Sequence, residues 1–392
     1  MDKDLQSIQE VRDLLNSASK AFEEYSQFSQ GQIDEIVREI CEEAQKHEVE
    51  LAKLANEETG FGRWEDKVLK NRLASVGVYE AIKDQKTKGI ILDDKEKRIT
   101  EIGVPMGIIA ALIPSTNPTS STIYKIMIAL KAGNAVIVSP HPNAKDCIIK
   151  TAEYLIKAAE RKGAPKGLIG VIKTPTLQAT QELMKHKKTS LILATGGEAM
   201  VKAAYSSGTP AIGVGPGNGP AFIERSADIR KAVKRIIDSK TFDNGVICAS
   251  EQSIVTEEVI KNQVVDELKR QGAYFLNKDE RNKVGSILMR ANNTMNPKID
   301  GKTALYIAAM AGITVPTTTK ILVSEETEVS HLNPYSREKL TTILAFYVEE
   351  NAEKACERAI ELLENEGEGH TLIIHSENKD IIREFALRKP VS

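Results

Sequence analysis

Residues 108–140 read IIAALIPSTNPTSSTIYKIMIALKAGNAVIVSP, and this stretch decides the fold. The apolar run at 108–113 ends at a proline, which is typical of a short buried strand. Residues 120–131 have the apolar spacing of a helix that Gly133 closes, and a second apolar run follows at 135–138. Strand, helix and strand in this order predict two parallel strands joined by a helical crossover.

The same alternation continues along the chain. Further strands are expected at 168–172, 191–194 and 211–214, with helices at 144–161, at 177–187 and after Gly197. A second series begins near Thr241, with strands at 253–256, 319–323, 342–347 and 371–375 and helices at 259–270 and 353–363. This pattern predicts an α/β fold of two Rossmann-like, doubly wound parallel-sheet domains with a cleft between them. We place the domains at residues 1–240 and 241–392.

The first hundred residues are expected to add helices and one exposed segment. Leu5, Ile8, Val11, Leu14 and Leu15 recur at helical spacing, which predicts a helix that packs on its own domain or, alternatively, docks a partner. Residues 33–54 predict a second long helix. Residues 86–100 are charged around an embedded Gly-Ile-Ile-Leu and suit an exposed hairpin or linker that could serve oligomerisation.

Composition excludes several classes of function. The 392 residues are too many for one ordinary core, and a net charge of −2 gives no electrostatic case for nucleic acid or an anionic membrane. No apolar run approaches the roughly 20 residues that span a bilayer, and Met1–Lys20 lacks a signal-peptide core. Four scattered cysteines form no CxxC pair, so we expect no metal site, no disulfides and a cytoplasmic location.

The most informative chemistry lies in residues 241–253, which read TFDNGVICASEQS. Asn244-Gly245 is a turn signal that places Cys248 between a turn and an apolar strand. A thiolate there could be partly exposed at a domain junction and attack a carbonyl. The alternative is a small buried apolar residue, and we assign Cys41, Cys147 and Cys356 to that alternative.

Three other stretches carry weaker signals. In residues 113–120, IPSTNPTS, Asn117 could donate its side-chain amide to a developing oxyanion, or simply make a turn. Residues 193–199, LATGGEA, run from a strand through two glycines into a helix, where a ligand could approach the backbone. Residues 212–220, IGVGPGNGP, are either a ligand-binding or a flexible loop.

Together these stretches resemble the aldehyde dehydrogenase superfamily. They look most like CoA-acylating acetaldehyde dehydrogenases and the aldehyde dehydrogenase part of bacterial bifunctional aldehyde–alcohol dehydrogenases. The phrases at 239–253, at 139–142 (SPHP) and at 200–208 (MVKAAYSSG) carry the likeness, which runs from about Glu24 to the end. The complete family pattern continues past residue 392, so we expect domain 241–392 to be truncated.

The resemblance implies roles for individual residues. Cys248 matches the nucleophile, and Asn117 with the Cys248 backbone amide matches the oxyanion hole. We assign NAD binding to Leu112, Ile113, Pro114, Ser115, Thr116, Asn117, Ser139, Pro140, Gly197, Gly215 and Glu338. His370 opens a strand and could accept the CoA thiol proton, or could merely pack its loop.

One departure from the family pattern bears on the reaction. Hydrolytic aldehyde dehydrogenases carry a water-activating glutamate where this sequence has Gly213. Without that carboxylate, CoA thiol is the expected nucleophile for the acyl-enzyme. The resemblance therefore implies reversible, NAD-dependent oxidation of a short-chain aldehyde, by default acetaldehyde, to acyl-CoA.

Two other functions stay as alternatives, and the partners follow from the resemblance. The alternatives are a hydrolytic aldehyde dehydrogenase that releases a free acid, and a structural or microcompartment-associated role. The expected partners are a small aldehyde, CoA and, in the complete protein, further copies in a homodimer or higher homo-oligomer. The expected location is the cytoplasm or the inside of a bacterial microcompartment.

Overall fold

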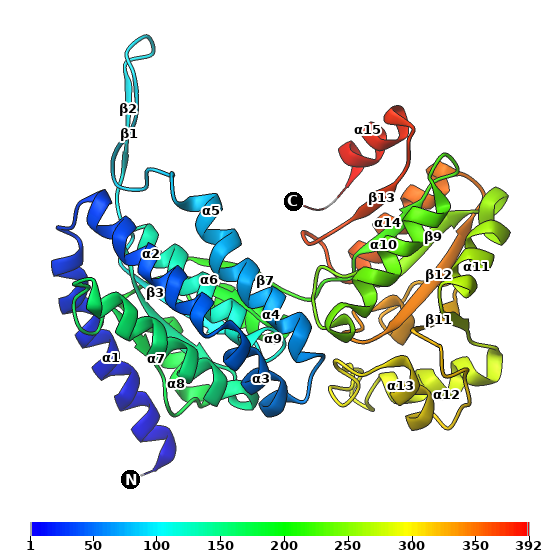
Figure 1. Cartoon of the computed structure of the whole chain (residues 1–392), viewed down its shortest axis with the longest axis horizontal. Helices are drawn as coiled ribbons and strands as arrows, with labels where there is room; N and C mark the ends of the chain where they lie inside the picture. Colours follow the sequence, from blue (N-terminus) through cyan, green and yellow to red (C-terminus); the bar gives the residue numbers. More distant parts are fainter. Residues whose placement is uncertain (1, 390, 392) are drawn as a thin grey trace. The chain divides into compact units, whose positions relative to one another are not determined.

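The computed structural model describes residues 2–389 and 391, which form two compact units. The first unit comprises the chain up to Gly60 and Trp64–Val214, and the second comprises Phe61–Arg63 and the chain from Gly215 onward. The division therefore falls at Val214, whereas the sequence pattern placed it near Thr241. The glycine-rich loop after residue 214 belongs to the second unit (Figure 1).

The first unit is built on a five-stranded parallel sheet in the order β5-β4-β3-β6-β7. Its strands are β3 (Ile108–Ile113), β4 (Ala135–Pro140), β5 (Ile169–Val171), β6 (Thr189–Thr195) and β7 (Ala211–Val214). From β3 the chain builds outward through β4 to β5, then returns to place β6 on the other side. The order therefore reverses between β3 and β6, and doubly wound sheets bind ligands at the carboxyl ends of strands at such a point.

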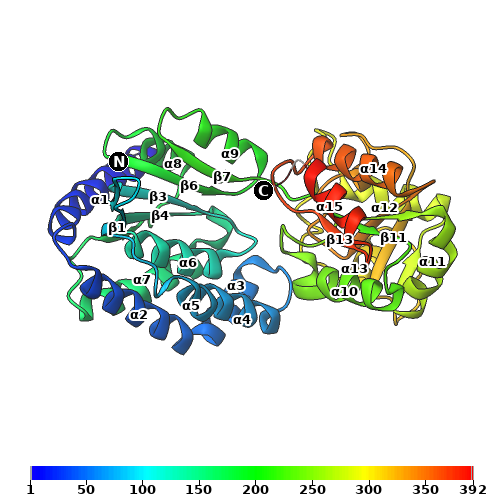
Figure 2. The same cartoon turned by 90° about the horizontal axis from the view of Figure 1, so that it is seen from above.

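Helices cover both faces of this sheet (Figure 2). They are α1 (Lys3–Tyr25), α2 (Gln30–Lys46), α3 (Glu48–Thr59), α4 (Trp64–Arg72), the π-helix η1 (Leu73–Gly77), α5 (Val78–Ile82), α6 (Pro118–Lys131), η2 (Pro142–Ala144), α7 (Lys145–Arg161), α8 (Leu177–Lys185) and α9 (Glu198–Tyr205). The apolar stripe of α1 packs against α8 and β4, with Val11 and Leu15 fully buried, which confirms packing on its own unit. The single long helix expected at 33–54 is wrong. It is broken at His47, whose φ of −105° and ψ of 7° end α2 and begin α3.

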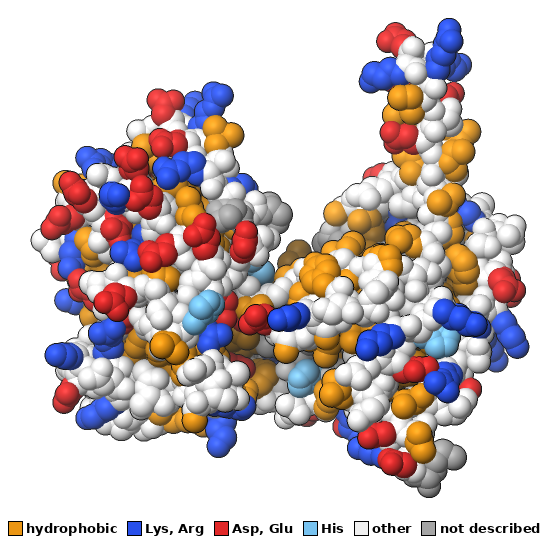
Figure 3. Space-filling model, turned by 180° about the vertical axis from the view of Figure 1, so that it is seen from behind, with side chains coloured by type: hydrophobic (Ala, Val, Ile, Leu, Met, Phe, Trp, Pro, Cys, Tyr) orange, Lys and Arg blue, Asp and Glu red, His pale blue; other side chains and the backbone are white. Residues whose placement is uncertain are grey.

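An antiparallel hairpin projects from the first unit and confirms the exposed-hairpin prediction (Figure 1). It consists of β1 (Gly89–Asp94) and β2 (Ile99–Gly103). Its apolar side chains stay exposed, including Ile90, Leu92 and Ile102, and Figure 3 shows them below a charged tip. A two-stranded ribbon with apolar side chains on its surface lacks a core of its own.

The second unit contains a six-stranded parallel sheet in the order β10-β11-β12-β9-β8-β13. Its strands are β8 (Pro220–Ile223), β9 (Ser253–Glu257), β10 (Ala273–Phe275), β11 (Ile321–Glu325), β12 (Ile343–Glu349) and β13 (Ile373–His375). The helices are α10 (Ile229–Thr241), η3 (Phe242–Gly245), η4 (Glu258–Ile260), α11 (Lys261–Arg270), α12 (Lys278–Leu288), α13 (Ala304–Met310), η5 (Pro334–Ser336), α14 (Ala352–Asn365) and α15 (Lys379–Arg388). Separate apolar clusters cover the two faces of the sheet.

Two parallel sheets, each covered by helices on both faces, confirm the predicted α/β class. Four strands of the second unit were expected, while the short strands β8 and β10 were missed. Within residues 2–389, no helix combines the length and the apolar character that crossing a bilayer requires.

The core of the first unit offers a test of the fold. Ile137 in β4 is fully buried, so Ile137→Ala should lower the free energy of unfolding by about 2–5 kcal/mol. Trp64 is the only tryptophan and lies in this unit, so its fluorescence can follow unfolding in guanidinium. The matched control is Ile90→Ala in the exposed hairpin, which should change stability by less than about 0.5 kcal/mol. Equal effects of the two substitutions would contradict the assigned strand.

Candidate active site

Cys248 is the half-buried cysteine among the four, and the other three are buried. Burial raises the pKa of Cys41 to about 11 and raises the pKa values of Cys147 and Cys356 as well. Those three thiols therefore stay protonated at neutral pH and agree with the reading of buried apolar residues. Cys248 differs from them in being accessible.

A strained turn precedes Cys248. Asp243, Asn244 and Gly245 all have left-handed backbones, with φ values of 50°, 52° and 80°. This conformation costs about 1–2 kcal/mol for each of the two residues that are not glycine. The turn persists because its side chains are held: Asp243 is fully buried, and the Asn244 amide donates to the Gly301 carbonyl over 2.9 Å.

The glycine-rich loop of the second unit brings Cys248 and His370 together. A Cβ atom on Gly217 would lie 2.0 Å from the carbonyl oxygen of Cys248 and 3.0 Å from Cε1 of His370. The carbonyl oxygen of Cys248 and Cε1 of His370 therefore both lie within 3.0 Å of the same point, so the two residues are neighbours. Only glycine fits at position 217, since any side chain would displace the backbone of the cysteine loop.

The His370 ring has one nitrogen engaged and one available. Its Nδ1 lies 2.7 Å from the Thr371 hydroxyl, while its buried Nε2 has no hydrogen-bond partner among the described residues. Burial lowers the pKa of His370, so the imidazole is neutral at pH 7. A neutral imidazole next to the nucleophile loop can accept a proton.

Glu338 lies on the other side of the glycine-rich loop. Its Oε1 accepts a hydrogen bond from the Gly217 amide over 2.7 Å, and its own amide donates to Glu366 over 2.6 Å. Burial raises the pKa of Glu338 to about 8, and the neighbouring Glu366 carboxylate adds to the increase. Glu338 therefore holds the backbone of the glycine-rich loop at Gly217.

In the first unit, a lysine orients Asn117. The Lys70 amine donates to Asn117 Oδ1 over 2.8 Å, and the Asn117 Nδ2 lies 3.3 Å from the Thr116 hydroxyl. Asn117 precedes α6 but its side chain does not cap the helix. With Oδ1 occupied by a cation, Nδ2 is fixed as the donor that an oxyanion needs. The sequence did not indicate a role for Lys70, because a lysine among the charged residues at 64–72 is typical of a helix face exposed to solvent.

The other residues assigned to the cofactor lie mostly along the carboxyl edge of the first sheet. Leu112, Ile113, Pro114, Ser139 and Pro140 are buried, Ser115 and Thr116 are half-buried, and Gly197 is exposed at the start of α9. The Ser139 hydroxyl already pairs with Thr180 over 3.1 Å, so only its backbone faces the edge. Gly215, half-buried, opens the second unit.

A buried lysine crosses the point where the strand order reverses. Lys125 of α6 donates to the Leu112 carbonyl over 2.7 Å and to the Leu193 carbonyl over 3.0 Å. Burial lowers the pKa of Lys125 to about 7. This side chain links β3 to β6 near their carboxyl ends. The sequence did not indicate its role, because one lysine in the apolar pattern of α6 has no distinguishing signature.

Gly213 lies on β7 with its missing side chain directed at α9. A Cβ atom there would lie 2.7 Å from Val201 Cγ1 and 2.9 Å from the Tyr205 ring. Ile212 and Val214 point to the opposite, exposed face of the strand. A glutamate at 213 therefore fits only if the side chains of Val201 and Tyr205 shift.

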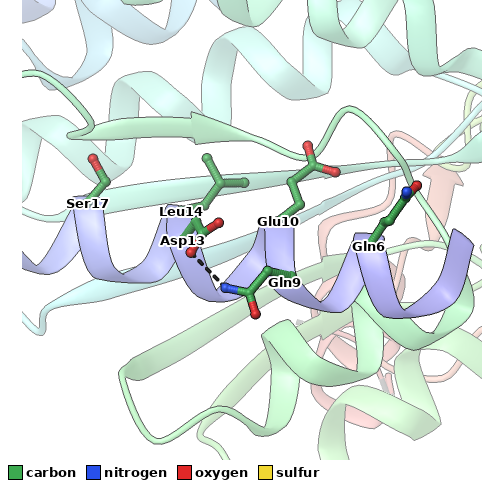
Figure 4. A pocket seen from close by; sticks show the side chains of 6 residues that line it. All are labelled: Gln6, Gln9, Glu10, Asp13, Leu14 and Ser17. Atoms are coloured by element: carbon green, nitrogen blue, oxygen red, sulfur yellow. Dashed lines mark hydrogen bonds between the residues drawn. The ribbon is translucent and has the colours of Figure 1, made fainter. Parts of the chain in front are cut away.

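The molecule also has a hollow away from these residues. It lies along α1 and is lined by Gln6, Gln9, Glu10, Asp13, Leu14 and Ser17 (Figure 4). Gln9 donates to Asp13 over 2.9 Å, and Glu10 accepts from the Lys173 amide over 2.6 Å. None of the predicted site residues contributes to it.

The first unit has a doubly wound parallel sheet, and the second holds the accessible Cys248 with His370 near it across Gly217. The family model described as the aldehyde dehydrogenase family matches residues 4–312. The chain belongs to the aldehyde dehydrogenase family.

Three relatives show how far the similarity extends. A probable aldehyde dehydrogenase from Listeria monocytogenes is 58% identical, with a TM-score of 0.98 over 100% of this chain and 86% of that one. An acetylating aldehyde dehydrogenase from Geobacillus thermoglucosidasius is 55% identical, with a TM-score of 0.97 over the same shares. The aldehyde-alcohol dehydrogenase of Clostridium acetobutylicum is 46% identical over 95% of this chain. The chain spans only 43% of that relative's length.

Two more distant structures contain bound groups. A propionaldehyde dehydrogenase from Rhodopseudomonas palustris holds CoA and an acylated cysteine; it is 29% identical, with a TM-score of 0.83 over 96% of this chain and 85% of that one. An engineered glycolyl-CoA reductase holds NADP⁺; it is 29% identical, with a TM-score of 0.84 over the same shares.

The Lys70–Asn117 contact yields a test of the oxyanion donor. Asn117→Ala should lower kcat by roughly 10²–10³, the usual loss for one such donor. Lys70→Met should produce a smaller loss, because it keeps the Asn117 amide but frees it to rotate. Steady-state NADH formation measures both. An unchanged kcat in Asn117→Ala would return this residue to a turn role.

Proposed function

We propose that this chain is a CoA-acylating, NAD-dependent aldehyde dehydrogenase. It would convert a short-chain aldehyde, CoA and NAD⁺ reversibly into acyl-CoA and NADH. The observation that carries the proposal is the accessible Cys248 beside a neutral His370 whose Nε2 is available. A relative at 55% identity that is named as an acetylating aldehyde dehydrogenase supports the same reaction.

Cys248 performs the covalent step. Its thiolate forms a bond to the aldehyde carbon, and the oxygen that becomes negative is stabilised by the Asn117 amide and the Cys248 backbone amide. When bound, NAD⁺ would accept the hydride that leaves this carbon. The product on the protein is a thioester of Cys248, which keeps the acyl group activated for transfer.

The carboxyl edge of the first sheet fits a dinucleotide. Ser115, Thr116 and Asn117 are accessible there, and the position of a Cβ on Gly197 has no atom within 4 Å. Glu338 would meet the nicotinamide ribose, with its carboxyl already tied to the Gly217 amide. We propose NAD rather than NADP as the dinucleotide.

His370 acts when the acyl group leaves. Its Nε2 accepts the proton of the CoA thiol, the resulting thiolate attacks the thioester carbon, and the Cys248 thiolate departs. The low pKa of His370 keeps this base neutral at physiological pH. A hydrolytic enzyme would need a carboxylate near the thioester, and Gly213 with its packed surroundings supplies none.

The aldehyde is proposed to be acetaldehyde. Relatives at lower identity are named for succinate semialdehyde and sulfoacetaldehyde, so the substrate varies within the family at 36% identity. A structural or microcompartment role without catalysis is the less favoured alternative, because the accessible Cys248 and the available Nε2 of His370 support a catalytic role.

We further propose that the complete protein is a homodimer or higher oligomer in the cytoplasm or in a bacterial microcompartment. The exposed Ile90, Leu92 and Ile102 of the hairpin would be covered by another copy of the chain.

The nucleophile is tested by Cys248→Ala, which should reduce NADH formation from acetaldehyde and CoA to below about a thousandth of the wild-type rate. Cys356→Ala in the same unit is the matched control, since its buried thiol should not matter to turnover. Omitting CoA should stop steady turnover of the wild type. Steady NADH formation without CoA would favour the hydrolytic alternative.

The base is tested by His370→Ala. Since His370 serves only acyl transfer, the variant should keep a single-turnover burst of NADH yet lose CoA-dependent turnover at least tenfold. In the wild type, lowering the pH should protonate His370 and reduce CoA-dependent turnover only below its ordinary pKa of about 6.5, because burial depresses that pKa. The control is His375→Ala, which changes another half-buried histidine of the same unit. Loss of the burst would assign His370 an earlier or structural role.

A further inference from the structure

Three residues from the N-terminal part of the chain belong to the second unit. Phe61–Arg63 connects α3, which ends at Thr59, to α4, which begins at Trp64, yet its contacts are with the second unit. We call it the 61–63 segment. The chain therefore leaves the first unit for only three residues and then returns to it.

The 61–63 segment bonds directly to the strained turn that precedes Cys248. The Arg63 amide donates to Asp243 Oδ1 over 2.7 Å. The Gly62 amide donates over 3.2 Å to the Gly301 carbonyl, which also accepts the Asn244 side-chain amide over 2.9 Å. The two left-handed residues of the turn that are not glycine, Asp243 and Asn244, are thus linked to the same short segment, Asn244 through the Gly301 carbonyl.

The packing here leaves no room for a side chain. Gly62 has a φ of +66°, and a Cβ on it would lie 1.8 Å from Asp243 Oδ1 and 2.7 Å from the Asp243 carbonyl oxygen. Gly301 has a φ of +68°, and its Cβ would lie 2.3 Å from the Gly62 nitrogen. Two glycines are required for the backbones and the Asp243 carboxyl to approach this closely.

Asp243 depends on this contact because it is fully buried in a left-handed backbone conformation that residues other than glycine seldom adopt. A buried carboxyl needs its hydrogen bonds to stay in place. If the Arg63 amide or the space above Gly62 were lost, the turn would relax toward ordinary backbone angles. Cys248, five residues after Asp243, would then be displaced relative to His370.

We propose that Gly62, the Arg63 amide and Asp243 position Cys248 for attack on the aldehyde. They are positioning residues, since they act through the turn and touch neither substrate nor cofactor. The inference rests on the proposed role of Cys248 as the nucleophile.

Gly62→Ala and Gly312→Ala form a matched pair for the test. Gly312 has a φ of +67° in the same unit, with no atom within 4 Å of its Cβ, so both substitutions introduce the same backbone strain. Only Gly62→Ala moves Asp243. We expect Gly62→Ala to lower kcat at least tenfold relative to Gly312→Ala, with the dissociation constant for NAD within threefold of wild type.

Asp243→Ala and Asp243→Asn decide the question if Gly62→Ala does not fold. Asparagine keeps an acceptor for the Arg63 amide, so Asp243→Asn should retain at least a third of the wild-type kcat, while Asp243→Ala should lose tenfold or more. A second measurement is the pH dependence of the rate at which iodoacetamide alkylates Cys248. This pH profile should shift in Asp243→Ala but not in Asp243→Asn.

Two results would overturn the inference: equal kcat values for Gly62→Ala and Gly312→Ala, or equal kcat values and alkylation profiles for Asp243→Ala and Asp243→Asn. Either leaves the role of Cys248 intact. Turnover by Cys248→Ala would instead contradict the proposed function, so the two failures can be told apart.

Discussion

The site depends on one close approach between two backbones, that of Gly217 and that of Cys248. No atom larger than hydrogen fits on Gly217, because a Cβ would be 2.0 Å from the Cys248 carbonyl oxygen. Glu338 holds the Gly217 amide from the other side, and the buried Asn218 anchors the loop by donating to two backbone carbonyls at 2.8 and 3.0 Å. Hydrogen bonds at Gly217 and Asn218 therefore fix the glycine-rich loop. Because Cys248 and His370 both pack against Gly217, the fixed loop sets their relative position.

Buried amines hold the loops and strand ends around the site. Burial lowers the pKa of Lys339 to about 7 and the pKa of Lys240 well below its usual value, and the Lys339 amine lowers the pKa of Lys240 further. Lys240 donates to Gln252 and to the Lys339 carbonyl, both at 2.9 Å, and Gln252 also accepts from the Lys339 amide over 2.9 Å. This network joins the segment after Cys248 to the segment after Glu338. In the first unit, Lys125 likewise donates to backbone carbonyls of two strands. In both units, buried lysines with lowered pKa values therefore serve as hydrogen-bond donors to backbone carbonyls.

Sequence reasoning found the elements that have a periodic pattern and the residues that follow a turn signal. The apolar runs predicted β3, β4 and β6, and Asn244-Gly245 predicted the turn before Cys248. It could not find Lys70, whose role comes from a contact 47 residues away, or the Arg63 amide, since a backbone donor has no residue signature. The boundary at Val214 was also missed, because the strand pattern does not show that β8 pairs with β9 and so begins the second sheet.

Gly213 alone does not explain whether CoA or water attacks the acyl group, because neighbouring side chains also limit what can stand at this position. Val201 and Tyr205 of α9 fill the space where a side chain would go, and the Tyr205 hydroxyl accepts from the Gly213 amide over 2.9 Å. Introducing a carboxylate would displace this ring and break its contact with the strand backbone, at a cost independent of catalysis. A side chain at position 213 would thus require Val201 and Tyr205 to shift. The absence of a carboxylate at this position is accordingly linked to how the side chains of α9 pack on the edge strand.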